Sequence, residues 1–241
     1  MLDITCYASG STGNCYTLTN GEAVIMLDCG LPFAEIMKRT DYHLPDAVLV
    51  THEHLDHAKA VADFAKRGID VYATAGTFEA LAFDCDCTRK HRLHTISYCD
   101  AFLVPGTYIY VCPFGTQHDA AEPCGFIVKD DDDCVLYATD TFFLRYKFDG
   151  LTKILIEANH SYEILQENVE NGTLDARLAK RLSKSHFSIE NVLEFLKAND
   201  LSEVKEIWLC HLSRDNADPK LFRRMVEEAT GKPTFIAGDD L

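Results

Sequence analysis

Three histidines and one aspartate occur within six residues, at His52, His54, Asp56 and His57. Neutral imidazole and carboxylate oxygen are the ligands that Zn²⁺ and similar divalent ions prefer. His52 and His54 are two residues apart, so in an extended loop they point the same way, whereas Asp56 and His57 would begin a helix and face a second ion. A histidine-rich loop that binds nothing is the alternative, but buried imidazoles without partners are costly. The spacing therefore predicts a site for two metal ions.

A short buried strand must place these ligands. Residues 47–50 are apolar and directly precede the histidines, which puts the ligands at the carboxyl end of a strand, where open α/β sheets form ligand crevices. A helix over 58–66 and a strand over 70–73 follow. Upstream, strands are expected over 2–7, 15–19 and 23–28, with a helix over 32–40. This alternation predicts a layered α/β architecture.

The overall composition is that of an ordinary globular protein. The 241 residues, 47% of them hydrophobic, can bury one substantial core, and we expect a single domain spanning 1–241. No apolar run approaches the length of a membrane span, and the amino terminus lacks a secretory signal, which predicts a cytoplasmic protein. The ten cysteines are scattered over predicted strands and are expected to be reduced thiols. Cys29, Cys85 and Cys87 have no further Cys-x-x-Cys pair with which to complete a zinc site.

The chain is acidic, with a formal net charge of −15. Proteins that follow a nucleic-acid backbone normally carry a basic stripe, because phosphate contacts supply most of the affinity. Basic residues here form only local clusters, at 89–92, at 180, 181 and 184, and at 223–224, and such clusters are usually solvated faces. The charge balance therefore favours a small anionic substrate over an extended polymer.

The stretch from Thr51 to His57, T-H-E-H-L-D-H, resembles the H-x-H-x-D-H signature of metallo-β-lactamase-fold hydrolases. His118, Asp140 and His211 each follow a predicted strand, and their order and separations resemble those of the family's third histidine, bridging aspartate and last histidine. Taken singly, each would more often be a core or surface residue. The resemblance implies an α/β fold of the αββα sandwich type, with two mixed sheets flanked by helices.

The same resemblance implies a ligand set. One ion would be held by His52, His54 and His118, and the other by Asp56, His57 and His211, with Asp140 bridging the two. Two Zn²⁺ ions are expected, and the same ligands accept Mn²⁺ or Fe. Asp28, at the end of a predicted strand, would hold a ligand histidine in its tautomer.

Two later motifs, I-L-I-E-A-N-H at 154–160 and S-H-F-S-I-E-N at 185–191, resemble those of ribonuclease Z and its relatives. There, a glutamate after a strand orients a histidine that begins a helix and assists at the leaving-group oxygen. The resemblance assigns these parts to Glu157 and His186, with Asp56 and Asp140 orienting the attacking water. A helix cap by Ser188, with His186 merely flanking it, is the alternative.

The substrate contacts are less defined. His160 is the second candidate for the leaving-group role, and the polar residues 161–184 are expected to form a helical insert over the site entrance. The loop 8–14, A-S-G-S-T-G-N, offers glycines for close backbone approach and donors for phosphate. We expect Ser11, Asn14 and His160 to contact substrate, although a plain turn is the alternative for the loop.

The spacing of the motifs also bears on the branch of the family. His118 and Asp140 leave too little chain for the tRNA-binding arm of ribonuclease Z. The motifs resemble those of YycJ/WalJ-type nucleic-acid exonucleases and, equally, of anti-Pycsar phosphodiesterases of phages and some bacteria, which open cyclic pyrimidine nucleotides.

The acidic charge favours the second branch. We therefore expect hydrolysis of 3',5'-cyclic nucleotides such as cCMP and cUMP to nucleoside monophosphates, which would counter anti-phage signalling in the host cytoplasm if a phage encodes the chain. A DNA or RNA exonuclease, a lactamase or thioesterase-type hydrolase, and a non-catalytic or oxygen-reducing relative are the alternatives. Relatives of this type often pair, so a homodimer is expected.

Overall fold

The computed structural model describes residues 1–82 and 90–238, so Cys85 and Cys87 lie outside the described part. Its strands form two mixed sheets flanked by helices, which confirms the predicted α/β class. The chain divides into two compact units, and each is described by itself. Unit 1 holds the described residues of 1–115 and 120–133, and unit 2 holds 116–119 and 134–238. The single domain expected for 1–241 stays a prediction.

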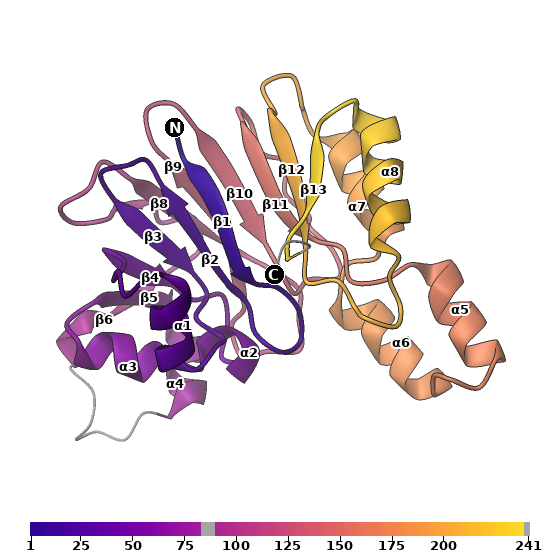
Figure 1. Ribbon diagram of the computed structural model, residues 1–241, viewed down its shortest axis with the longest axis horizontal. Coiled ribbons are helices and arrows are strands. Elements are labelled where there is room, and N and C mark those ends of the chain that lie inside the picture. The colour runs from indigo at the N-terminus through magenta and orange to yellow at the C-terminus, as the bar shows by residue number, and fades with distance from the viewer. Residues whose placement is uncertain (83–89, 239–241) are drawn as a thin grey trace. The chain divides into compact units, whose positions relative to one another are not determined.

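Unit 1 is built on a six-stranded sheet in the order β1 to β6 (Figure 1). β1, β2 and β3 are antiparallel neighbours, and β3 to β6 run parallel. Parallel strands put their carboxyl ends at one sheet edge, which is where the residues after β3 and β4 emerge. The strands are β1 (Asp3–Ala8), β2 (Cys15–Thr19), β3 (Val24–Leu27), β4 (Ala47–Leu49), β5 (Asp70–Thr74) and β6 (Leu93–Ile96).

Helices α1 (Phe33–Arg39) and α3 (Val61–Lys66) supply apolar side chains to the core of unit 1. Ile36 and Phe64 from these helices belong to the same buried cluster as Met26, Val48 and Val71 of the sheet. Burial of such side chains stabilises the fold by about 1.5–3 kcal/mol each.

The helix predicted over 58–66 is wrong as one element, because the chain forms α2 (Leu55–Ala58) and α3 with a break between them. The break allows the Ala60 N–H to donate to the Cys29 carbonyl at 3.0 Å. Unit 1 also contains α4 (Ala75–Leu81), a short 3-10 helix (Lys90–Arg92) and three antiparallel strands, β7 (Phe102–Leu103), β8 (Tyr110–Gly115) and β9 (Cys124–Lys129).

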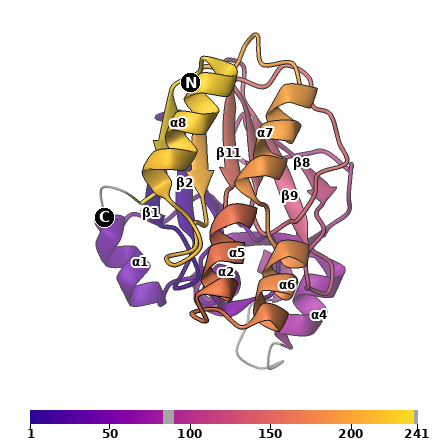
Figure 2. The same cartoon turned by 90° about the vertical axis from the view of Figure 1, so that its right-hand side faces the viewer.

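Unit 2 contains four parallel strands, β10 (Cys134–Ala138), β11 (Lys153–Glu157), β12 (Glu206–Cys210) and β13 (Thr234–Ile236). Every residue of β10 and β11 is buried, as expected for parallel strands covered on both faces. Figure 2 shows the helices of this unit as two neighbouring pairs, α5 (Tyr162–Glu170) with α6 (Ala176–Ser185), and α7 (Ile189–Ala198) with α8 (Pro219–Thr230). The predicted helical insert at 161–184 is thus a helical hairpin. No helix within the described residues is long and apolar enough to cross a membrane.

Candidate metal-binding site

The loop after β4 brings two histidines of unit 1 together. His52 Nε2 lies 3.1 Å from His54 Nδ1, and the two rings meet nearly edge to face. Two nitrogens bound to one tetrahedral ion at about 2.1 Å would be about 3.4 Å apart. The two side chains therefore converge as expected for ligands of one metal ion.

His57, in the single turn of α2, is held through one ring nitrogen. Its Nδ1 is 2.8 Å from Asp28 Oδ2, and both side chains are fully buried. Asp28 also accepts hydrogen bonds from the Thr51 N–H and hydroxyl at 2.8 and 3.0 Å. With Nδ1 donating to Asp28, His57 Nε2 is the ligand atom, and Asp56 Oδ2 lies 3.7 Å from it.

Asp28→Asn is expected to weaken metal affinity by about 10–100-fold, the range seen when the hydrogen-bond partner of a ligand histidine is changed. An amide cannot hold the His57 Nδ1–H as a carboxylate does. Competition with a chromogenic chelator measures the affinity. The matched control is Asp63→Asn, because the Asp63 side chain is half exposed and pairs with Arg67 at the surface. Equal affinities in the two variants would show that Asp28 does not orient His57.

Gly30, shortly after β3, lies against the backbone of Asp56 and His57. A Cβ at Gly30 would lie 1.7 Å from the Asp56 carbonyl oxygen, which is backbone and cannot rotate away. The surrounding chain is tied by hydrogen bonds from Cys29 N–H to the His57 carbonyl and from Asn14 N–H to the Asp56 carbonyl, both 2.7 Å. Only glycine fits at this position.

Gly30→Ala is therefore expected to destabilise the protein by about 3 kcal/mol or more, at the upper end of overpacking effects. Thermal unfolding with and without added Zn²⁺ measures the loss. Gly106→Asn serves as the control, because a Cβ at Gly106 meets no atom within 4 Å and asparagine tolerates its φ of +79°. An unchanged melting temperature for Gly30→Ala would contradict the close approach.

Unit 2 brings together the other three predicted ligands, His118, Asp140 and His211. Asp140 Oδ2 is 3.4 Å from His118 Nε2, and Asp140 Oδ1 is 3.6 Å from His211 Nδ1. The His118 Nδ1 donates to the Ser185 carbonyl at 2.8 Å, which leaves Nε2 as the ligand atom. The two carboxylate oxygens thus face different imidazoles. Ligand atoms lie within 4.8 Å of one another in the set Asp140, Glu157, His186 and His211. This set of side chains indicates a site for a divalent metal ion.

Glu157, the last residue of β11, is the centre of the polar contacts in unit 2. Its Oε1 is 2.7 Å from His186 Nδ1 and 3.0 Å from His211 Nδ1, and its Oε2 accepts the backbone N–H groups of Thr141 and Phe187. Burial opposes ionisation of this carboxyl, but His186 and the hydrogen bonds lower its pKa to about 2. Burial would also lower the pKa of His186, yet the Glu157 carboxylate outweighs it and raises that pKa.

The sequence predicts that His186 begins a helix. This prediction is wrong, because His186 lies between two helices. It is the C-terminal cap of α6, and α7 begins at Ile189. Ser188 caps α7 by accepting the Asn191 N–H, so the alternative cap exists. The cap and the Glu157 contact occur together, because His186 precedes the cap by two residues.

His160 differs from His186 in its surroundings. It is fully buried, and neither ring nitrogen has a hydrogen-bond partner within the described residues. Burial lowers the pKa of His160 to about 4, with Glu157 opposing this and His186 adding to it. A neutral, enclosed imidazole is poorly suited to give a proton to a leaving group, so these surroundings favour His186 for that role.

The predicted substrate residues of the 8–14 loop have different environments. Ser11 is exposed, whereas Asn14 is fully buried and exchanges hydrogen bonds with the Gly10 backbone. The Asn14 amide nitrogen is also 3.0 Å from His57 Nε2. Asn14 therefore links the loop to a predicted ligand, and the substrate role of both residues stays a prediction.

Three predicted site residues adopt left-handed backbone at the ends of strands. Asp28 after β3, Asp140 after β10 and His211 after β12 have φ values of 55°, 42° and 53°. Such conformations cost about 1–2 kcal/mol for residues other than glycine and concentrate at functional sites. The strain at these positions is consistent with residues held for their side chains.

Sequence reasoning missed two supporting residues. Thr51 bonds to Asp28 and places its hydroxyl 3.0 Å from His52 Nδ1, and Asn159 donates to the His211 carbonyl at 3.0 Å. Both lie next to motif residues along the chain. Their polar side chains directly after buried strands were the available signal.

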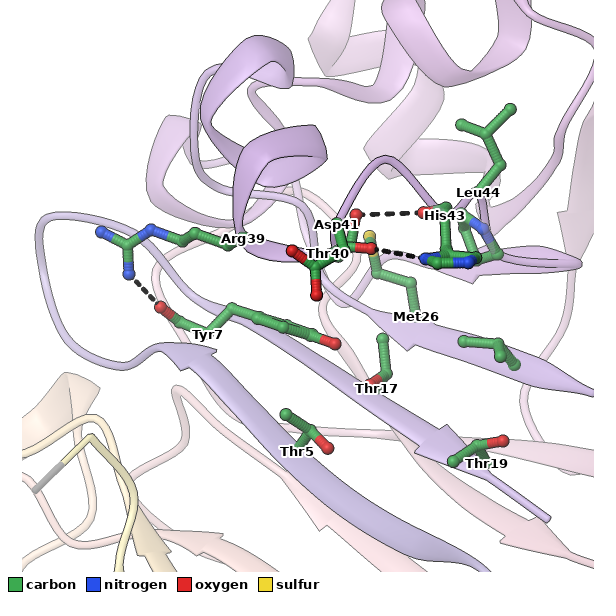
Figure 3. A pocket seen from close by; sticks show the side chains of 12 residues that line it. Thr5, Tyr7, Thr17, Thr19, Met26, Arg39, Thr40, Asp41, His43 and Leu44 are labelled. Carbon is green, nitrogen blue, oxygen red and sulfur yellow. Dashed lines mark hydrogen bonds between the residues drawn. The ribbon is translucent and has the colours of Figure 1, made fainter. Parts of the chain in front are cut away.

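A separate cavity of about 280 Å³ lies in unit 1 (Figure 3). Threonine hydroxyls of β1 and β2 line it on one side, and Arg39 and His43 line it on the other. Arg39 donates to the Tyr7 carbonyl there. Its lining includes none of the predicted ligand or catalytic residues, so we place no part of the predicted site in it.

The geometry and the fold agree with comparisons to known proteins. The profile of the family described as Beta-lactamase superfamily domain matches residues 24–211. The chain therefore belongs to this family, in the phosphodiesterase and nuclease branch of the metallo-β-lactamase fold, and is a metal-dependent hydrolase.

Individual relatives cover nearly the whole chain. It is 31% identical over 229 residues to Exodeoxyribonuclease WalJ of Streptococcus pneumoniae, covering 87% of this chain and 81% of that protein. It is 28% identical over 254 residues to Exodeoxyribonuclease YycJ of Bacillus anthracis, covering 99% and 92%. The crystal structure of the metallo-β-lactamase fold protein YhfI from Bacillus subtilis matches with a TM-score of 0.70 at 16% identity, over 98% of this chain and 97% of that chain. That likeness shows the fold.

Proposed function

We propose that the protein is a metal-dependent phosphodiesterase that removes nucleotides from an end of a DNA strand. The observation that carries the proposal is the buried Glu157 carboxylate 2.7 Å from His186 Nδ1, with Asp140 Oδ2 3.8 Å from the same nitrogen. An imidazole held by a carboxylate is suited to donate a proton or hydrogen bond to a departing alkoxide. Hydrolysis of a lactam or thioester does not require the Glu157 and His186 pair. The exodeoxyribonuclease names of the two relatives support DNA as the substrate.

We also propose that the predicted ligands of both units act together on two divalent ions, with Zn²⁺ preferred and Mn²⁺ or Fe as alternatives. Bound ions would make water a nucleophile near neutral pH and neutralise charge on the phosphate. Asp56 and Asp140 orient the attacking water, and Glu157 positions His186 at the leaving oxygen. The proposed ligands are His52, His54, Asp56, His57, His118, Asp140 and His211.

A second candidate substrate is a 3',5'-cyclic nucleotide such as cCMP or cUMP, which would be opened to a monophosphate. The net charge of −15 favours it, because a small anion needs only local neutralisation. A role against cyclic-nucleotide anti-phage signalling, the cytoplasmic location and the pairing of two copies stay predictions.

The test uses purified protein with Zn²⁺ or Mn²⁺ on bis-p-nitrophenyl phosphate, end-labelled single-stranded DNA, cCMP, cUMP, pre-tRNA and nitrocefin. Stepwise shortening of DNA, abolished by EDTA, is the expected result. Turnover of the cyclic nucleotides without DNA cleavage would assign the second candidate, and turnover of nitrocefin alone would refute both. A protein treated with EDTA and reloaded with metal controls for damage by the chelator.

A further inference from the structure

Helix α6 carries four cations on one face. Arg177, Lys180, Arg181 and Lys184 are spaced three or four residues apart, so their side chains lie on one side of the helix, and all four are exposed. We call these four residues the α6 basic face. The helix itself contains no acidic residue, although the whole chain carries a net charge of −15. The face is therefore a local exception to the charge of the protein.

The α6 basic face is also largely without counter-charges. Arg181 is 3.4 Å from Asp119 in an exposed pair, which contributes little. In the described part of the chain, Arg177, Lys180 and Lys184 form no ion pair. Other helices behave differently, since an arginine pairs with an acid four residues away in α1, α3 and α8.

This arrangement costs helix stability. Like charges four residues apart oppose each other by about 0.2–0.5 kcal/mol per pair. The helix dipole favours Lys184 in the last turn but disfavours Arg177 in the first. Neither local pairing nor the helix dipole therefore accounts for the face.

The C-terminal end of the α6 basic face lies close in sequence to His186, and its helix is hydrogen-bonded to His118 of the same unit. Lys184 is two residues from His186, and the Ser185 carbonyl accepts the hydrogen bond from His118. The ten residues of α6 extend about 15 Å at about 1.5 Å per residue. One strand of B-form DNA advances about 3.4 Å per phosphate, so the face spans several phosphates.

We propose that the α6 basic face binds the phosphate backbone of single-stranded DNA and directs the strand toward His186. The proposal rests on the phosphodiesterase function above and adds the surface that would hold the polymer beyond the scissile bond. It also accounts for an acidic protein acting on a polyanion, because the cations are gathered on one helix. The helical hairpin that carries the face is visible in Figures 1 and 2.

The test is binding of a fluorescein-labelled single-stranded DNA of twelve thymidines, followed by anisotropy in EDTA from 25 to 200 mM KCl. The variant is Arg177→Gln, Lys180→Gln and Lys184→Gln together, because glutamine keeps helix propensity. We expect at least tenfold weaker binding at 25 mM KCl. The slope of log K against log salt should shrink by about 2, since each phosphate contact on a single strand contributes about 0.7. Circular dichroism verifies that the variant keeps its helices.

The matched control removes three exposed cations from α8, with Lys220→Gln, Arg223→Gln and Arg224→Gln, and should bind within twofold of the unchanged protein. Equal loss in both variants, unchanged binding by the α6 variant, or no binding by the unchanged protein would each overturn the proposal. So would displacement of the DNA by an equal charge concentration of polyglutamate, which would assign the face to an acidic protein. Because EDTA stops cleavage, the anisotropy measures DNA binding alone and tests the role of the α6 basic face. Hydrolysis of bis-p-nitrophenyl phosphate by the unchanged protein separately decides the phosphodiesterase proposal.

Discussion

Asp140→Ala is expected to remove bound divalent metal and to lower phosphodiester turnover by more than about 10²-fold, because changing even an outer partner of a metal ligand costs about 10–100-fold. Asp140 is buried, and its two oxygens lie 3.4 and 3.6 Å from the imidazoles of His118 and His211. Alanine would leave two converging imidazoles without the carboxylate between them. Metal content by mass spectrometry of the purified protein and turnover of bis-p-nitrophenyl phosphate are the two measurements.

Asp119→Ala is the control for this variant. Asp119 is adjacent to His118 in sequence, but its side chain is 71% exposed and forms an ion pair with Arg181. It should retain both metal and turnover. Full metal content in Asp140→Ala would remove Asp140 from the ligand set, and full turnover would remove it from the mechanism.

His186→Ala is expected to keep its metal but to lose about 10²–10⁴-fold in turnover, the range for a positioned general acid. Its Nδ1 is bonded to Glu157, so the other ring nitrogen is the one that would meet the leaving oxygen. A substrate with a good leaving group needs less protonation. Turnover of bis-p-nitrophenyl phosphate should therefore fall less than cleavage of DNA.

His43→Ala, at an exposed histidine of unit 1, controls for removal of an imidazole and should leave the metal content and turnover unchanged. The difference between the two substrates separates chemistry from folding, because a misfolded protein would lose both activities equally. Loss of metal from His186→Ala would instead place His186 among the ligands. Equal losses on both substrates would contradict the leaving-group role.

Sequence reasoning succeeded where the signal is local. The clustering of His52, His54, Asp56 and His57 follows from their spacing after a buried strand, and this spacing is fixed by strand and helix geometry alone. The convergence of His118 and Asp140 in unit 2 required the resemblance, because 22 residues of sequence separate them. The assembly of both ligand groups into one site stays a prediction.

Sequence reasoning failed where distant backbone decides the local structure. The Ala60 N–H donates to the Cys29 carbonyl at the break between α2 and α3. Alanine has a high helix propensity, so the local sequence does not predict this break. The position of His186 before α7 depends on the capping of that helix by Ser188 together with the Glu157 contact. The basic residues of α6 were visible as a cluster, but their common face emerged only with the helix bounds.

The left-handed turns at Asp28, Asp140 and His211 have a consequence for how such a fold can diversify. Each lies one or two residues after the end of a strand, before the chain enters a connecting segment. Insertions or deletions farther along that segment can therefore change what surrounds the chemistry while the reacting groups keep their places. New substrate ranges in this architecture would evolve through changes in the connecting segments, while the backbone at these three residues is kept.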